Sequence, residues 1–135
     1  DMVRVAKYVG IHNAVMELED GYSTVLNERG TNLSYGQRQL ICLARAIIAD
    51  PRILVFDEAT SSVDPYTESM IQETLRREMM NRTVILVTHR VSTVRDSDRI
   101  IILQEGVVED DGTHEQLLER SMLYRKLCEM QLVSV

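Results

Sequence analysis

The sequence has few of the features that mark membrane-spanning, secreted or nucleic-acid-binding proteins. No apolar run in its 135 residues approaches the roughly 20 residues that cross a bilayer. The opening stretch, DMVRVAKYV, has neither the apolar core nor the cleavage site of a signal peptide, so we expect none. Lys and Arg number 15 against 21 Asp and Glu, and the net charge of −6 argues against nucleic-acid binding, which uses cations to neutralise phosphates. A mononucleotide is not excluded, because backbone N–H groups and a metal ion can hold one.

Cysteine is also scarce. The two cysteines, Cys42 and Cys128, are far apart and belong to no CxxC pattern. We therefore expect neither a disulfide nor a zinc site, which fits a reducing cytoplasm. Cys42 lies in an apolar stretch and is expected to be a small core residue.

Hydrophobic periodicity predicts one α/β domain with a largely parallel sheet. The first helix is expected over 3–16 with a break at Gly10, and the second, mostly buried, over 34–49. Two more are expected after Pro65 and around 92–95. One last helix should begin at the capping box of Thr113 and Gln116 and carry Leu127 and Met130. Continuous apolar runs at 53–56 and 83–87 predict strands covered on both faces. The segments 100–103 and 107–108 predict a hairpin.

The run ILVFDE, residues 53–58, ends a predicted strand with two carboxylates. Open α/β sheets bind ligands at the carboxyl ends of their strands. Asp57 could hold Mg²⁺ through water, and Glu58 could polarise an attacking water. The alternative is a strand end that places two solvated acids before a turn.

His89 follows the second predicted strand. If the two strands are neighbours, His89 lies at the same edge as Glu58 and can contact a terminal phosphate. The alternative is an ordinary loop histidine.

The stretch NLSYGQRQ, residues 32–39, opens the helix predicted over 34–49. Ser34 offers a hydroxyl beside the unpaired N–H groups of a first helical turn, and Gly36 allows a ligand to approach the backbone. Simple N-capping by Ser34 explains the same residues. The polar loop ATSSVDP, residues 59–65, follows the carboxylates, and its Asp64 either caps the next helix or contributes to the same site.

Taken together, these segments resemble the nucleotide-binding domain of ATP-binding cassette (ABC) proteins, a P-loop NTPase fold. NLSYGQ resembles the family signature, ILVFDEATSSVD resembles the Walker B strand with the catalytic glutamate and D-loop, and LVTHRVST resembles the switch-histidine loop. The resemblance implies ATP and Mg²⁺ as cofactors and a metal role for Asp57. It implies catalytic roles for Glu58 and His89, and nucleotide contacts from Ser34, Gly36, Gln37 and Asp64.

The resemblance narrows to exporters through the segment NERG, residues 27–30. It implies that the loop near Glu28 and Arg29 contacts transmembrane domains, that a second nucleotide-binding domain completes each site, and that the domain works at the cytoplasmic face of a cell or organelle membrane. Residues 1–50 correspond to a helical subdomain with the signature, and 51–135 to the Walker B, D-loop, switch-histidine and C-terminal part.

The sequence departs from the family pattern at two points. Tyr35 stands where a glycine is usual, so its ring either crowds the nucleotide or points away. No GxxxxGKS/T phosphate loop occurs in the 135 residues, so the resemblance covers only the C-terminal part of the domain. We expect this stretch alone to be inactive and, because its sheet lacks neighbours, to self-associate or be marginally stable.

Two other functions remain open from the residues. One is a soluble ABC ATPase of DNA repair or translation, which nucleic-acid affinity would favour. The other is a non-catalytic interaction module, which keeps the helices but carries out no chemistry.

Overall fold

The computed structural model describes residues 1–57 and 63–132. The chain forms two compact units, Asp1–Ile85 and Leu86–Val135. The subdomain boundary predicted at residue 50 stays a prediction. None of the helices within the described ranges combines the length and the apolar character that a membrane span requires.

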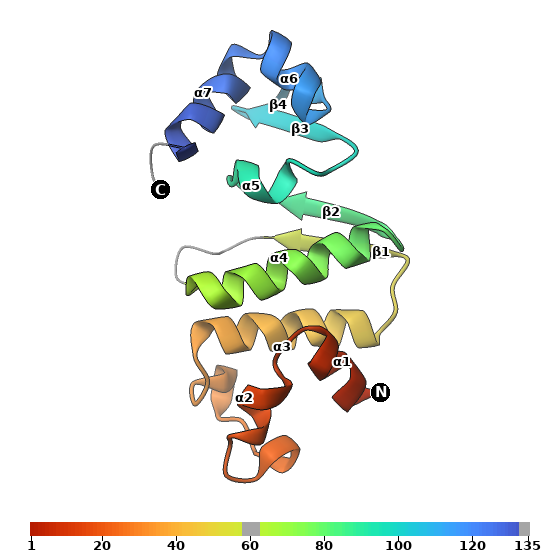
Figure 1. Ribbon diagram of the computed structural model, residues 1–135, viewed down its shortest axis with the longest axis vertical. Helices are drawn as coiled ribbons and strands as arrows, with labels where there is room; N and C mark the ends of the chain where they lie inside the picture. The colour runs from red at the N-terminus through yellow and green to blue at the C-terminus, as the bar shows by residue number, and fades with distance from the viewer. Residues whose placement is uncertain (58–62, 133–135) are drawn as a thin grey trace. The chain divides into compact units, whose positions relative to one another are not determined.

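The first unit contains helices that precede and follow the first strand (Figure 1). Its elements are α1 (Met2–Tyr8), α2 (His12–Met16), the 3₁₀ turns η1 (Gly21–Ser23) and η2 (Glu28–Gly30), α3 (Tyr35–Ile48), β1 (Ile53–Asp57), α4 (Pro65–Met79) and the start of β2 (Thr83–Val87). The predicted break at Gly10 is confirmed, since Gly10 has φ +86° and separates α1 from α2. A side chain is strained at that φ, and a Cβ there would also meet the Met70 sulfur.

Helix α3 packs between α1 and α4 through one apolar stripe. Leu40 and Leu75 are each only 1% exposed, and burying such a side chain contributes about 1.5–3 kcal/mol. The stripe of α3 itself comprises Gly36, Leu40, Leu43 and Ala44. The expectation that Cys42 is a core residue is wrong, because Cys42 is exposed. It lies off this stripe, and the helix is amphipathic rather than mostly buried.

A buried carboxylate ties α4 to α1 and to the turn before β1. Glu78 is 3% exposed and accepts a hydrogen bond from the Tyr8 hydroxyl at 2.9 Å. Burial, followed by this bond, raises the pKa of Tyr8. The Arg82 Nε atom lies 2.7 Å from Glu78 Oε2, and its Nη1 atom donates to the Pro51 carbonyl at 2.7 Å. The ion pair thereby fixes the chain where it enters β1.

Strands β1 and β2 are parallel neighbours in a two-stranded sheet, as predicted (Figure 1). The prediction that both are covered on two faces is wrong for this chain. Leu54 is buried, but Ile53, Val55, Ile85 and Val87 are about half exposed or more, at 57%, 61%, 48% and 53%. The described residues therefore cover these four apolar side chains only in part.

The second unit is built on an antiparallel hairpin, as predicted. Its elements are the end of β2, α5 (Val91–Val94), β3 (Ile100–Gln104), β4 (Val107–Gly112), α6 (His114–Arg120) and α7 (Met122–Leu132). The hairpin carries a register shift between Ile102 and Leu103. Its core consists of Ile100, Ile102, Leu117, Tyr124 and Cys128, with Val91 and Val94 of α5 packed against it.

The expectation of one last helix is wrong, because the helix is interrupted at Ser121. Ser121 adopts an extended conformation, φ −92° and ψ 111°, and its hydroxyl accepts a hydrogen bond from the Tyr124 N–H at 3.2 Å. That bond satisfies an N–H group in the first turn of α7. The buried face of α7 therefore carries Tyr124 and Cys128, whereas Met130 is 61% exposed.

Candidate functional site

The first turn of α3 is closed by a capping box between Ser34 and Gln37. The Ser34 hydroxyl accepts the Gln37 N–H at 3.1 Å, and the Gln37 side-chain oxygen accepts the Ser34 N–H at 2.8 Å. The predicted capping role of Ser34 is confirmed. Both residues are accessible, and a ligand that bound their side chains would have to replace this pair of bonds.

Gly36 has a packing role that sequence reasoning did not assign. A Cβ on Gly36 would lie 2.8 Å from Thr67 Cγ2, which is closer than real Cβ contacts. Thr67 is buried in the first turn of α4. The absence of a side chain at Gly36 therefore lets the N-terminal ends of α3 and α4 meet.

Tyr35 is held against its own helix. Its hydroxyl accepts a hydrogen bond from Gln39 Nε2 at 3.0 Å, and the Arg38 guanidinium carbon lies 5.7 Å from the ring centroid. The ring thus has partners one turn along α3, which is how this chain accommodates an aromatic residue within the NLSYGQ stretch.

Arg38 anchors the segment before α3, and sequence reasoning missed this residue. Its Nη1 atom donates to the carbonyls of Leu33, at 2.7 Å, and Gly30, at 3.3 Å. Arg29 adopts φ +59°, an uncommon value for a residue with a side chain. A cationic side chain one turn into a helix that follows a glycine-containing turn was the available signal.

Of the three predicted acidic residues, the structure describes Asp57 and Asp64. Asp57 is the exposed last residue of β1, and Glu58 lies outside the described residues. Asp64 caps α4 by accepting the Thr67 N–H at 3.0 Å, and this backbone hydrogen bond is the main reason that its pKa is lowered. Through Thr67, the cap of α4 therefore lies beside Gly36 of α3.

His89 is exposed and follows β2 in the second unit. The segment around it is held by side chains: the Arg90 N–H donates to the Thr88 hydroxyl at 3.0 Å, and the Val91 N–H donates to the Gln131 side-chain oxygen at 2.7 Å. His89 and Asp57 belong to different units of the chain. The functional roles of all these residues stay predictions.

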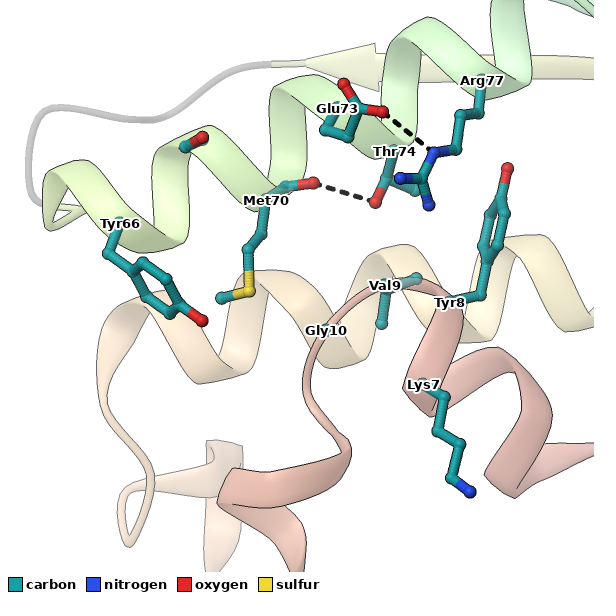
Figure 2. A pocket seen from close by; sticks show the side chains of 10 residues that line it. Lys7, Tyr8, Val9, Gly10, Tyr66, Met70, Glu73, Thr74 and Arg77 are labelled. Carbon is teal, nitrogen blue, oxygen red and sulfur yellow. Dashed lines mark hydrogen bonds and ion pairs between the residues drawn. The ribbon is translucent and has the colours of Figure 1, made fainter.

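A cleft of about 300 Å³ lies elsewhere in the first unit, between α1 and α4 (Figure 2). Tyr8, Tyr66 and Met70 line it together with the ion pair of Glu73 and Arg77, whose atoms are 3.0 Å apart. None of the predicted site residues lines this cleft. In the described part of the chain, no three His, Cys, Asp or Glu side chains are grouped as metal ligands.

Comparison with known proteins identifies relatives over nearly the whole chain. A family model described as ABC transporter matches residues 6–61. The ABC transporter ATP-binding protein YknU of Bacillus subtilis, itself uncharacterized, is 46% identical over 97% of this chain. The alpha-hemolysin translocation ATP-binding protein HlyB of Escherichia coli O157:H7 is 44% identical over 96% of it. The chain spans only 22% and 18% of the lengths of these two proteins.

A solved structure has the same fold. The structure of a bacterial Atm1-family ABC exporter with ATP bound matches 97% of this chain with a TM-score of 0.89 and 39% sequence identity. The chain corresponds to 23% of that exporter chain. The α/β fold predicted from the sequence is therefore confirmed.

Proposed function

Because the chain belongs to the ABC transporter family of ATP-binding domains, we propose that it forms the signature, Walker B and switch-histidine part of an ATPase that drives export. One observation carries the proposal. The signature opens α3, Asp57 ends β1 and His89 follows β2, in that order, in a chain whose fold matches an ABC exporter. In the proposed arrangement, residues 1–50 form the helical subdomain and 51–135 the remainder.

The residues present fit ATP and Mg²⁺ in part. Asp57 is an exposed carboxylate at a strand end, and one such ligand suits Mg²⁺, which keeps most of its water. The first turn of α3 carries no acidic residue, so its N–H groups face no competing negative charge. Because the 135 residues include no GxxxxGKS/T loop, we expect them not to hydrolyse ATP by themselves. When bound, ATP with Mg²⁺ supplies the phosphoanhydride that is hydrolysed.

Each predicted site residue receives a separate role in this proposal. Asp57 would hold the metal, Glu58 would orient and deprotonate the attacking water, and His89 would donate a hydrogen bond toward the terminal phosphate. Ser34, Gly36 and Gln37 face a nucleotide held by a second ATP-binding domain. Asp64, as the cap of α4, would keep the start of α4 beside Gly36 of the signature.

Transmembrane domains are the second proposed partner, met at the loop that contains Glu28 and Arg29, on the cytoplasmic face of a membrane. Support comes from the exposed apolar residues beside that loop, since Val25 is 86% and Leu26 42% exposed. Arg38 fixes the end of the same loop onto α3, so movement of the loop would reach the signature directly.

The test is Glu58→Gln in the full-length transporter. We expect hydrolysis to fall roughly 10²- to 10⁴-fold, because the amide cannot accept a proton, while ATP still binds. Glu109→Gln, at an exposed position of β4, is the matched control and should hydrolyse ATP normally. Turnover at the wild-type rate in Glu58→Gln would overturn the assigned role.

A further inference from the structure

The segment between β2 and α5 depends on side chains for its backbone hydrogen bonds. Val91 is the first residue of α5, and its N–H is one of the donors that a helix cannot satisfy internally. The N-cap residue, Arg90, makes no side-chain capping bond. A donor left without an acceptor costs about 1–3 kcal/mol when it is buried, so an acceptor must come from elsewhere.

Gln131 of α7 supplies that acceptor and also a donor. Its side-chain oxygen accepts the Val91 N–H at 2.7 Å, and its Nε2 atom donates to the His89 carbonyl. The two bonds span 40 and 42 residues of sequence and lie within the second unit. A glutamine amide is suited to this because it presents one donor and one acceptor side by side.

We propose that Gln131 is a positioning residue for His89, an inference that rests on the proposed function. The side-chain amide of Gln131 holds the backbone on both sides of Arg90, at the His89 carbonyl and at the Val91 N–H. Among the described residues, the His89 imidazole has no hydrogen-bond partner of its own. Its direction is therefore set by the backbone that Gln131 holds.

The clamp is separable from the packing of α7. Tyr124 and Cys128 dock α7 on the hairpin and are 2% and 9% exposed, whereas Gln131 lies at the far end of the helix and is only partly buried. Val91 and Val94 independently pack α5 on the same core. Loss of the Gln131 amide should therefore release the His89 segment without unfolding the unit.

The experiment compares Gln131→Leu with Glu129→Leu in the full-length transporter. Gln131→Leu removes both bonds, and we expect kcat to fall roughly tenfold with the KM for ATP changed less than about twofold. The Val91 amide should exchange its hydrogen faster, and the melting temperature should stay near that of the wild type. Gln131→Glu keeps only the acceptor, so it should protect the Val91 amide and give an intermediate kcat. Glu129→Leu makes the same new side chain on an exposed part of α7 and should leave all four measurements unchanged.

His89→Ala separates the two proposals. If His89→Ala abolishes hydrolysis and Gln131→Leu retains the wild-type kcat, the clamp is wrong and the proposed function stands. If His89→Ala hydrolyses ATP normally, the assigned role of His89 fails, and the positioning role fails with it. If the melting temperature of Gln131→Leu falls and the loss of kcat is explained by the smaller folded fraction, Gln131 acts on folding alone. That result would also overturn the positioning role.

Discussion

Helices α3 and α6 begin with the same capping device in two different settings. In α3 the bonds from the Gln37 N–H and to the Gln37 side chain measure 3.1 and 2.8 Å. In α6 the corresponding bonds between Thr113 and Gln116 measure 3.3 and 3.0 Å. Hydrogen bonding therefore does not distinguish a proposed nucleotide contact from an ordinary helix start.

The charge of the first turn does distinguish them. In α6, the Glu115 carboxylate accepts hydrogen bonds from the Glu115 backbone N–H and from the Thr113 hydroxyl, and these bonds lower the pKa of Glu115. This carboxylate therefore compensates the positive end of the helix. Helix α4 likewise has Asp64 as its cap and Glu68 in its first turn. Helix α3 has no acidic residue there. Of these three helix starts, that of α3 carries the least negative charge, which suits the proposed nucleotide contact.

The largest expected difference between the two boxes is in ATP hydrolysis. Ser34→Ala and Thr113→Ala should each cost about 1 kcal/mol of stability, the usual value of an N-cap. Only Ser34→Ala should also lower the ATPase rate of the full-length transporter, by roughly 10²–10³, the effect of losing one donor to a developing charge. Denaturant unfolding and steady-state hydrolysis measure the two effects. Equal ATPase losses in both variants would contradict a special role for the α3 box.

The second prediction concerns the third residue of each box, Gly36 in α3 and Glu115 in α6. Replacing a helical glycine by alanine ordinarily stabilises a helix by about 1 kcal/mol. Gly36→Ala should instead destabilise by about 1–3 kcal/mol, because its Cβ would overlap Thr67 Cγ2. Adding Thr67→Ser removes that methyl group and should recover part of the loss. If Gly36→Ala alone stabilised the domain, the close approach of α3 and α4 would be ruled out.

Local signals predicted most of the fold. Gly10 broke the first helix, Ser34 and the pair of Thr113 and Gln116 capped helices, and the turn between 104 and 107 gave the hairpin. Each of these depends on a few neighbouring residues.

The errors concern burial, which depends on distant parts of the chain. The runs at 53–56 and 83–87 read as covered strands, yet the described residues cover only part of them. Cys42 was predicted to be a core residue because the periodicity of its apolar helix did not show which stripe faces α1 and α4.

Other features had weak or no local signals. Ser121 interrupts the last helix without a glycine or proline to signal the break. The site residues were predicted from motifs. Arg38 was missed although its position one turn into α3 was a signal, and Gln131 was missed because its partners are backbone groups 40 and 42 residues away, which leave no pattern in the sequence.

The third prediction adds the missing charge to α3. Tyr35→Glu places a carboxylate in its first turn, as Glu115 does in α6, and should lower the ATPase rate roughly tenfold by repelling phosphate. Cys42→Glu adds the same charge at an exposed position two turns along the helix and serves as the control. The loss should shrink as salt is raised, because exposed charges are screened. Equal ATPase rates in Tyr35→Glu and Cys42→Glu would show that the charge of the first turn of α3 does not affect hydrolysis.

The smallest effect is on the pH dependence of stability. The folded pKa of Glu115 is lowered from 4.5, so its carboxylate stabilises the domain fully above that unfolded value. The contribution is lost as the pH falls through the lower folded pKa. Between pH 5 and 3, wild-type stability should therefore fall slightly more than that of Glu115→Gln, measured by urea unfolding. Parallel curves would mean that Glu115 does not compensate the dipole of α6, and the contrast with α3 would then have to rest on Ser34 alone.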